Sequence, residues 1–384
     1  MKFSGYKIDI WILLPVILLM MFSIGAVYSA SSYFSMDKFN DSNYMLKHHS
    51  LRVLLALLMI FLFTRIDFRI YKDIGKYLIW ISILALIFIF IFGVSTVKGA
   101  SRWINLGPLS FQPADLAKFT LIIYLSALLV KKKNYAHMLY KGYLPLIFYI
   151  LVVSGLVALQ PNFSTAFIIF GTSVMLLLIS PVKIKHIIIT LLCMIPVAVS
   201  FILSKSYIVG RLTSHADYAS GGSSNYQLRQ ALLGFGNGGF FGVGPGNSMQ
   251  REYFLPEAYG DFIYAIVGEE YGFIGAFTVL VLFMIILVRG LKVSKMIKDE
   301  FGKYLSFGIT MILSFYAVVN MSVACGLIPT TGVPIPFVSY GGTALLFNSI
   351  GVGILLNISS YRNETDEEMI NEGNKVIEIN SKVG

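Results

Sequence analysis

The chain has 384 residues, of which 56% are hydrophobic and only 13% charged, and its mean hydropathy is +0.75. Because a soluble domain carries about 25% charged residues, this composition excludes a water-soluble globular enzyme, a disordered chain and a disulfide scaffold. The formal charge is +10. In a membrane protein such an excess of Lys and Arg indicates which loops lie in the cytoplasm, and it does not indicate nucleic-acid binding. Both cysteines, Cys193 and Cys325, lie in apolar runs and indicate neither a disulfide nor a metal site.

Apolar runs recur along the chain, and a run of about 20 residues is long enough to cross a bilayer as a helix. The first run, from Trp11 to Ala30, shows no small-residue cleavage site and therefore predicts a first membrane helix, not a signal peptide. Together the runs predict an all-α polytopic membrane protein with ten transmembrane helices, over residues 11–30, 49–64, 77–95, 115–130, 143–160, 163–180, 187–204, 262–288, 304–325 and 340–358.

Basic residues indicate how these helices are oriented. With the N-terminus in the cytoplasm, 20 of the 30 Lys and Arg fall on the inner side, and four of the other ten sit in one long outer segment that weighs little in the positive-inside rule. We therefore expect both termini to be cytoplasmic. Residues 1–360 form the predicted membrane domain, and residues 361–384 form a solvated, disordered cytoplasmic tail.

Two outer segments are longer than the other connections, residues 96–115 and residues 205–260, the second lying just before helix eight. Long segments without obvious structure of their own are usually functional. The Gly-rich stretch 234–246 contains a match to the dinucleotide-binding fingerprint, but no βαβ unit surrounds it. Its glycines are better explained by tight turns and close backbone approach.

Four acids lie in or at the edge of the predicted hydrocarbon region. Asp115 opens helix four, Asp261 opens helix eight, and Glu269 and Glu270 lie inside helix eight. Ionisable groups there are costly and indicate function. A structural interpretation also exists for each: Asp261 can be an N-terminal charge favoured by the helix dipole, and the two glutamates can be buried partners of polar groups.

Several cations accompany these acids on the outer side. Lys118 lies one turn after Asp115, so the two charges can neutralise one another. The same cations could hold a phosphate or pyrophosphate at the membrane face. The outer cations include Lys98, Arg102, Lys118, Arg211, Arg229 and Arg251, while the five histidines show no metal-ligand spacing.

Three motifs resemble those of the SEDS proteins (shape, elongation, division and sporulation), in the same order and within the same ten-helix frame. The first runs from Gly99 to Gly107 and from Phe111 to Lys118, the second from Leu255 to Gly272, and the third from Gly326 to Gly342. The resemblance covers about residues 8–360. Tyr28-Ser-Ala-Ser31 and Tyr226-Gln227 are more similar to the division branch (FtsW) than to the elongation branch (RodA).

The resemblance implies a peptidoglycan glycosyltransferase that joins the disaccharides of lipid II into glycan strands at the outer face of the bacterial cytoplasmic membrane, at the division septum. It also implies a class B penicillin-binding protein and division proteins as partners. The family's essential carboxylate matches Asp261, and Arg102, Asp115 and Lys118 match positions that line its central cavity. The candidate substrate-binding residues are Arg102, Lys118, Arg211, Asp115, Gln112, Tyr226, Gln227, Glu257 and Ser339.

The chain departs from the family pattern at three places. Asp115 stands where the family commonly has Glu, which keeps the charge and shortens the reach. Asn162 replaces a common Asp, so that position has no acid, base or metal role here. Tyr259-Gly260 replaces a common His-Thr before the essential Asp, which removes a histidine proton shuttle.

Strand synthesis needs a carboxylate base within about 3 Å of the attacking hydroxyl and cations where charge develops on the leaving pyrophosphate. We expect Asp261 to be the base, with inversion at the donor carbon, and Arg102, Lys118 and Arg211 to contact the pyrophosphate. The sequence shows no metal cage and no certain cofactor, although a divalent cation (Mg or Mn) could assist. Two alternatives fit the same composition, a flippase for lipid II or another lipid-linked sugar, and a non-catalytic scaffold for a cell-wall synthase.

Overall fold

The computed structural model describes residues 2–3, 6–92, 96–97, 100–106, 109–222 and 224–361. The part of the predicted tail after residue 361 lies outside the described residues, as does Lys98. In chain order the helices are α1 (Ile10–Phe39), α2 (Tyr44–Arg65), α3 (Ile70–Phe92), α4 (Pro113–Lys131), α5 (Leu144–Leu159), α6 (Phe163–Leu178), α7 (Ile184–Leu203), α8 (Ser206–Ala219), α9 (Tyr226–Gly238), α10 (Ile263–Met296) and α11 (Glu300–Ala324), followed by a last helix, Thr343–Tyr361.

Short segments complete the element order. Three antiparallel strand pairs join β1 (Lys2–Phe3) to β2 (Tyr6–Lys7), β3 (Thr96–Val97) to β4 (Ala100–Ser101), and β5 (Ile104–Leu106) to β6 (Leu109–Phe111). In the last pair Ile104 lies opposite Phe111. π-Helical turns cover Leu139–Tyr143 and Gln250–Phe254. The described fold is thus overwhelmingly helical, which confirms the predicted class.

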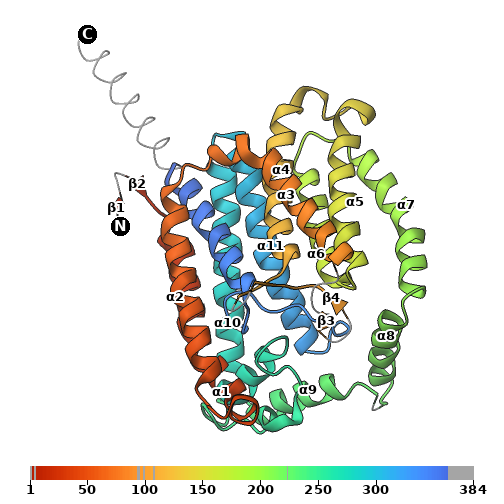
Figure 1. The fold of residues 1–384 in the computed structure, drawn as a ribbon. Coiled ribbons are helices and arrows are strands. Elements are labelled where there is room, and N and C mark those ends of the chain that lie inside the picture. Colours follow the sequence, from red (N-terminus) through yellow and green to blue (C-terminus); the bar gives the residue numbers. More distant parts are fainter. Residues whose placement is uncertain are drawn as a thin grey trace.

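The helices stand side by side in one bundle. Figure 1 shows α2 at one side and α7 and α8 at the other, with α10 and α11 between them. The Asp9 N–H donates to Ser359 Oγ at 3.0 Å, so the first and last helices meet at one end of the bundle, called here the terminal end. The opposite end carries α8, α9 and residues 250–261 and is called the loop end.

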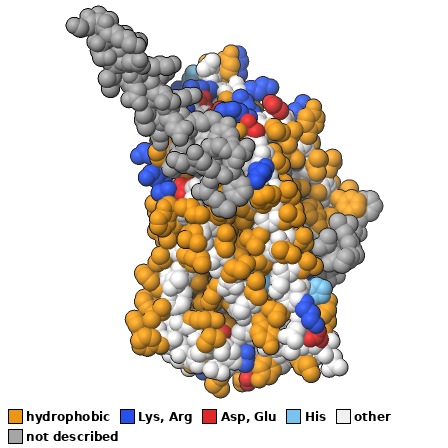
Figure 2. Space-filling model, turned by 90° about the vertical axis from the view of Figure 1, so that its left-hand side faces the viewer, with side chains coloured by type: hydrophobic (Ala, Val, Ile, Leu, Met, Phe, Trp, Pro, Cys, Tyr) orange, Lys and Arg blue, Asp and Glu red, His pale blue; other side chains and the backbone are white. Residues whose placement is uncertain are grey.

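The helix lengths suit a bilayer. Among the described residues, nine helices are long and apolar enough to cross a membrane, and α6 is a shorter apolar helix of 16 residues. These ten correspond to the ten predicted runs. Figure 2 shows hydrophobic side chains over the middle of one face, with Lys and Arg gathered toward the terminal end. The positive-inside rule places that end in the cytoplasm, and the orientation stays a prediction.

Buried polar side chains fasten the terminal end. The Asp9 carboxylate accepts a hydrogen bond from Arg289 Nη2 on α10 at 2.7 Å. On the last helix, Asn357 Nδ2 donates to Thr64 O, and Asn357 Oδ1 accepts from Phe68 N–H, both at 2.9 Å. Polar groups at membrane depth need partners inside the protein, so these bonds set how α1, α10, the α2–α3 turn and the last helix meet.

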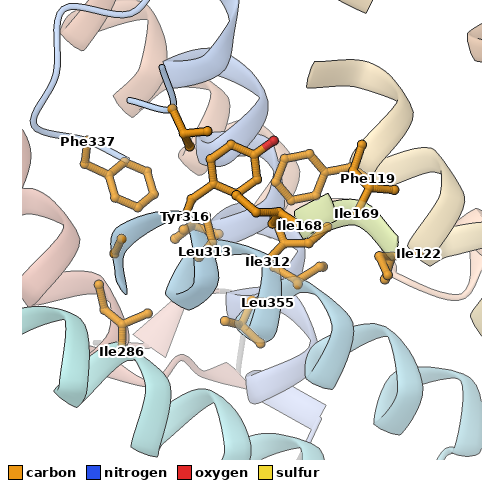
Figure 3. Packing of buried hydrophobic residues seen from close by; sticks show 14 of the residues in the cluster. Phe119, Ile122, Ile168, Ile169, Ile286, Ile312, Leu313, Tyr316, Phe337 and Leu355 are labelled. Carbon is orange, nitrogen blue, oxygen red and sulfur yellow. The ribbon is translucent and has the colours of Figure 1, made fainter. Parts of the chain in front are cut away.

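The apolar core lies where α4, α6, α10, α11 and the last helix converge (Figure 3). Helix α11 packs against α10, α4 and α6, which makes it the central helix. Gly308 on α11 faces α4, and a Cβ at this position would overlap Ile122 Cγ2. The labelled core side chains are Phe119, Ile122, Ile168, Ile169, Ile286, Ile312, Leu313, Tyr316, Phe337 and Leu355.

Helix α10 is broken at Gly272, where φ is 65° and ψ is −163°. The Gly-rich segment 239–244 pairs with the broken part, which explains its composition, because a Cβ on Gly242 would overlap Glu270 O. The backbone bonds run from Val243 N–H to Glu269 O (3.0 Å), from Gly244 N–H to Glu270 O (3.0 Å), from Phe273 N–H to Gly239 O (2.9 Å) and from Ile274 N–H to Phe240 O (3.3 Å).

Glu269 and Glu270 of α10 lie next to the break at Gly272 and accept hydrogen bonds from neighbouring segments. Glu269 and Glu270 are 0% and 1% exposed. The Glu269 carboxylate accepts from Ser248 Oγ and from Gln250 N–H, and the Glu270 carboxylate accepts from Ser29 Oγ on α1. They are therefore buried partners of polar groups, as their structural interpretation predicts.

The predicted loop 205–260 differs from the structure. It contains α8 and α9, which the search for long apolar runs could not detect because both helices are amphipathic and short. The Asn225 side chain caps α9 by accepting from Leu228 N–H at 3.2 Å, a signal that the sequence does carry. The first helix also extends to Phe39, nine residues beyond the predicted end.

Close packing at Gly308 leads to a stability prediction. Gly308→Ala should push α11 away from Ile122 and destabilise the fold by about 1–3 kcal/mol, the usual cost of overpacking a core. The measurement is the thermal unfolding midpoint of the purified protein in detergent. Gly155→Ala on α5 is the matched control, because no heavy atom lies within 4 Å of its added Cβ. Equal midpoints for the two variants would contradict the prediction.

Candidate active site

The segment just before α10 is held at three successive carbonyl groups. All three donors come from α11 or from the segment that follows it, residues 325–342, which contains the third motif. Tyr259 O accepts from Tyr340 N–H at 2.9 Å, Gly260 O from Ser339 Oγ at 2.8 Å, and Asp261 O from Asn320 Nδ2 at 2.7 Å. The backbone of the candidate catalytic residue and of the two residues before it is therefore fixed by α11 and the third motif together.

Asn320 joins the two segments directly. Its side-chain amide is 1% exposed and also donates to Val333 O at 2.7 Å, so it bridges the segment before α10 and the third motif. Ser339 acts in the same way, because its Oγ accepts from Ile335 N–H at 3.0 Å while donating to Gly260 O. Ser339 is buried, and its hydroxyl is committed to these backbone partners.

Asp261 itself is half-buried at the N-terminal end of α10. A Cβ built on Gly332 would lie 3.5 Å from Asp261 Oδ2 and 3.9 Å from Arg211 Nη2, so this carboxylate and this guanidinium converge on the same glycine. Gly332 has φ of 72°, a left-handed conformation that favours glycine. The third motif thus approaches both charged groups at a residue that has no side chain.

Beside these groups lies a cavity of about 290 Å³. It lies where the start of α6, the end of α7 and α8 face residues 328–331 of the third motif. Arg102 and Arg211 are its charged lining residues, and most of the remaining wall is apolar. The lining also includes Asn162, Phe163, Phe167, Tyr207, Ile208 and Pro329.

Arg102 is anchored at the junction of α5 and α6. Its guanidinium donates to Gln160 O at 3.3 Å and to Pro161 O. Burial lowers the pKa of Arg102 below its ordinary value, and Arg211 adds to this effect, whereas Tyr207 and Asp261 oppose it. Arg102 therefore lies within electrostatic range of both Arg211 and Asp261, a concentration of positive charge next to one carboxylate.

Two tyrosines border the same charges. Burial raises the pKa of Tyr207, and the neighbouring Arg102 and Arg211 lower it. Burial, followed by Glu257, Tyr340 and Asp261, raises the pKa of Tyr259 to about 12. Like an ordinary tyrosine, Tyr259 therefore stays protonated near pH 7 and cannot take up a further proton.

Asp115 and Lys118 lie apart from the cavity. Lys118 Nζ and Asp115 Oδ1 are 3.0 Å apart, Lys118 is 0% exposed, and its ammonium lies 4.4 Å from the centre of the Tyr316 ring. Thr343 Oγ1 donates to Asp115 Oδ2 at 3.2 Å. The predicted mutual neutralisation is confirmed, but the structure does not bring Lys118 to Arg102 and Arg211.

The remaining candidates fall in different places. Gln112 precedes α4, and its N–H donates to Thr343 Oγ1 at 3.2 Å. Tyr226 and Gln227 begin α9, and neither lines the cavity, with Tyr226 49% exposed. Glu257 has φ of 59° and lies close enough to Tyr259 to influence its pKa. In the described part of the chain, no group of three or more His, Cys, Asp or Glu side chains could hold a metal ion.

Sequence reasoning did not single out Asn320 or Tyr207. Asn320 is an amide within the long apolar run of α11, and a polar group at membrane depth is itself a signal. Tyr207 precedes Arg211 by four residues on α8, a spacing that places both on one helix face. Both signals become specific only when the neighbouring elements are known.

Comparison with known proteins identifies the chain. The model of the cell cycle protein family named for FtsW, RodA and SpoVE matches residues 10–364. The chain belongs to this family. The predicted resemblance, which includes all three motifs, is thereby confirmed.

Curated members of the FtsW/RodA/SpoVE family match over almost the whole chain. The probable peptidoglycan glycosyltransferase FtsW of Geobacter sp. strain M18 is 34% identical over 361 residues, which cover 94% of this chain and 98% of that protein. Stage V sporulation protein E of Bacillus subtilis strain 168 is 33% identical over 354 residues, which cover 91% and 97%. The family member described here thus resembles FtsW more than RodA, as predicted.

Solved structures show the same family fold. A chain from the structure titled "Structural coordination of polymerization and crosslinking by a peptidoglycan synthase complex" aligns with a TM-score of 0.76 at 23% identity, covering 94% of this chain and 99% of that chain. The RodA protein of Thermus thermophilus aligns with a TM-score of 0.68 at 24% identity, covering 93% and 98%. The fold of these solved structures is therefore present here.

The Asn320 bridge leads to a local prediction. Asn320→Leu should leave Asp261 O and Val333 O unpaired, and amide hydrogens in residues 255–262 and 329–341 should exchange roughly tenfold faster, the effect of losing about 1.4 kcal/mol of local stability. Hydrogen–deuterium exchange mass spectrometry measures this. Asn357→Leu is the matched control, because Asn357 makes a similar bridge at the terminal end. Unchanged exchange around Asp261 in the Asn320 variant would refute the bridge.

Proposed function

We propose that this protein polymerises lipid II into glycan strands at the outer face of the cytoplasmic membrane. The observation that carries the proposal is the convergence of Asp261 and Arg211 on Gly332, beside a largely apolar cavity that also contains Arg102. A lipid-linked sugar pyrophosphate has a matching set of parts, namely an apolar chain, two anionic phosphates and a reactive sugar. The FtsW name of the curated relatives supports the same reaction.

Asp261 acts as the general base in this proposal. It takes the proton of the acceptor hydroxyl as the oxygen attacks the donor anomeric carbon, and the bond from that carbon to the pyrophosphate breaks with inversion. A positioned base typically contributes about 10²–10⁴-fold to such a step. The three backbone bonds at residues 259–261 support this role, because a base needs a fixed approach to the hydroxyl.

Arg102 and Arg211 receive the negative charge that develops on the leaving pyrophosphate. Guanidinium groups suit this task because they stay charged and can donate two parallel hydrogen bonds to phosphate oxygens. The apolar wall of the cavity, from Phe163, Phe167 and Ile208, can cover part of the lipid chain. A divalent cation bound to the pyrophosphate would add to the positive charge.

Asp115 and Lys118 have a supporting role in the proposal. Their buried ion pair connects α4 to Thr343 on the last helix and to Tyr316 on α11. Gln112 N–H meets the same Thr343 hydroxyl. The pair therefore sets how the first motif packs against α11. Because Asn320 on α11 donates to Asp261 O, the pair affects the reaction only by positioning Asp261.

The FtsW relatives favour work at the division septum with a class B penicillin-binding protein and division proteins as partners. The related structure in a peptidoglycan synthase complex supports a protein that works in an assembly. The flippase and scaffold alternatives are separated from the enzyme by one experiment. Purified protein receives labelled lipid II in detergent, where there is no second compartment and no synthase to recruit, and only a polymerase forms glycan strands.

Removal of the Asp261 carboxylate tests the proposed base. Asp261→Asn should lower strand synthesis by at least about 10²-fold while the protein keeps its melting temperature. Asp217→Asn near the end of α8 removes a carboxylate that binds Ser224 and does not line the cavity, so it is the matched control and should retain activity. Normal polymerisation by the Asp261 variant would remove this residue from the mechanism.

Loss of either guanidinium tests the pyrophosphate contacts. Arg102→Gln and Arg211→Gln should each lower kcat/KM by about 10- to 100-fold, the range expected for a charge-assisted hydrogen bond of about 1.5–3 kcal/mol. Steady-state kinetics on lipid II provide the measurement. Arg229→Gln on the exposed surface of α9 removes the same charge and should behave like the unmodified protein. If all three variants lose activity equally, the effect is one of net charge.

A further inference from the structure

Arg52 is a further cation in a membrane-spanning helix, on the side of the candidate active site that faces away from Arg102 and Arg211. Arg52 is on α2, a helix apolar enough to cross a membrane, eight residues after its first residue, Tyr44. At about 1.5 Å per residue, Arg52 Cα is roughly 12 Å along the helix from the loop end. Helical side chains tilt toward the N-terminus, and a long arginine can reach further toward the interface. The Arg52 guanidinium is therefore directed to the level of lipid headgroups.

Arg52 is half-buried, and its guanidinium lies 4.6 Å from the centre of the Tyr340 ring. Among the described residues, no ion pair includes Arg52. Lys47, the nearest cation before it on α2, already pairs with Asp41 at 2.8 Å. A cation in an apolar setting is costly without a counter-charge, and a ring quadrupole compensates only part of that cost. The geometry thus leaves guanidinium donors available to an anion.

Tyr340, whose ring lies against the Arg52 guanidinium, also contacts the segment just before α10, residues 259–261. Tyr340 N–H donates to Tyr259 O at 2.9 Å, and the rings of Tyr340 and Tyr259 meet edge to face with their centres 6.0 Å apart. Arg52 is therefore one side chain away from the segment that carries Asp261. It approaches from α2, whereas Arg211 approaches from α8, at the opposite side of the bundle (Figure 1).

We propose that Arg52 is the phosphate-binding residue of a second lipid site, which lies between α2 and Tyr340. Arginine binds phosphate through paired N–H donors, and stacking on Tyr340 holds the guanidinium plane in one orientation. The ligand is a lipid that carries a phosphate or pyrophosphate at the outer membrane face. This inference rests on the proposed function in one respect: a polymerase needs two lipid-linked substrates, and the cavity beside Arg102 and Arg211 accounts for one.

The experiment measures binding and not activity. Native mass spectrometry of the purified full-length protein in detergent micelles, titrated with undecaprenyl pyrophosphate, should show two bound lipids per chain. Arg52→Gln should weaken one of the two by about tenfold, the loss of one charge-assisted hydrogen bond, and Arg211→Gln should weaken the other. Arg52→Lys keeps the charge and should retain most of the binding. A melting temperature for each variant shows that the fold is intact.

The matched control is Lys47→Gln, which removes one positive charge from the same end of α2 at a residue that already has a partner. This variant should bind both lipids as the unmodified protein does. Dioleoylglycerol, which has no phosphate, should not compete for the Arg52-dependent site. Undiminished binding of both lipids by Arg52→Gln, or equal loss in Lys47→Gln, would overturn the proposal.

Two further measurements complete the experiment. A competition with phosphatidylglycerol identifies the source of the phosphate, and lipid binding by Asp261→Asn separates this inference from the proposed function. If phosphatidylglycerol competes at the Arg52-dependent site as well as undecaprenyl pyrophosphate does, the ligand is a phospholipid headgroup. If it does not compete, the ligand is the lipid-linked substrate. Asp261→Asn should bind both lipids normally. Should that variant still polymerise while Arg52→Gln loses one lipid, the proposed base fails and the second lipid site stands.

Discussion

The peptide carbonyls just before α10 belong to half-buried residues at the loop end, and each accepts a hydrogen bond from within the protein. Asn320 and Ser339 donate from their side chains to Asp261 O and Gly260 O, and Tyr340 donates from its backbone to Tyr259 O. Unpaired polar groups at membrane depth cost several kcal/mol. The same bonds that satisfy these carbonyls therefore also fix the backbone from which the Asp261 side chain extends. The same three hydrogen bonds thus contribute to the stability of the fold and to the geometry of the candidate site.

A second backbone junction follows the same rule within α10. The break at Gly272 exposes peptide groups, and the Gly-rich segment 239–244 pairs with them. Glu269 and Glu270 then hold that segment through Ser248, Gln250 N–H and Ser29. As a result, the first part of α10, from Ile263 to Gly272, is held by the Gly-rich segment. The residues just before α10, 259–261, are held by α11 and the third motif.

Charge is distributed unevenly around this fixed segment. Arg102 and Arg211 lie with the cavity on the α8 side, Arg52 lies on the α2 side, and Lys118 is neutralised by Asp115 inside the bundle. Arg102 and Arg211 thus lie on one side of the segment that carries Asp261, and Arg52 lies on the other. Burial, followed by Glu257, Tyr340 and Asp261, raises the pKa of Tyr259 to about 12, so this phenol stays protonated near pH 7, as an ordinary tyrosine does, and cannot act as the base. The proton chemistry therefore falls to the carboxylate in the proposed mechanism.

The sequence alone determined the ten-helix class and the family, and it named Asp261 as the candidate base, because apolar run length and local motifs are properties of neighbouring residues in the chain. It also predicted the Asp115–Lys118 pair, which depends only on helical spacing. It did not predict α8 and α9, which lack long apolar runs, nor that the wall of the cavity would include Arg102 and Arg211 but not Lys118. Only the tertiary structure brought Asn320, Ser339 and Tyr340 to residues 259–261 and placed Arg52 over Tyr340. These contacts join residues that are 59 to 288 positions apart, and their formation depends on how the helices pack around α11.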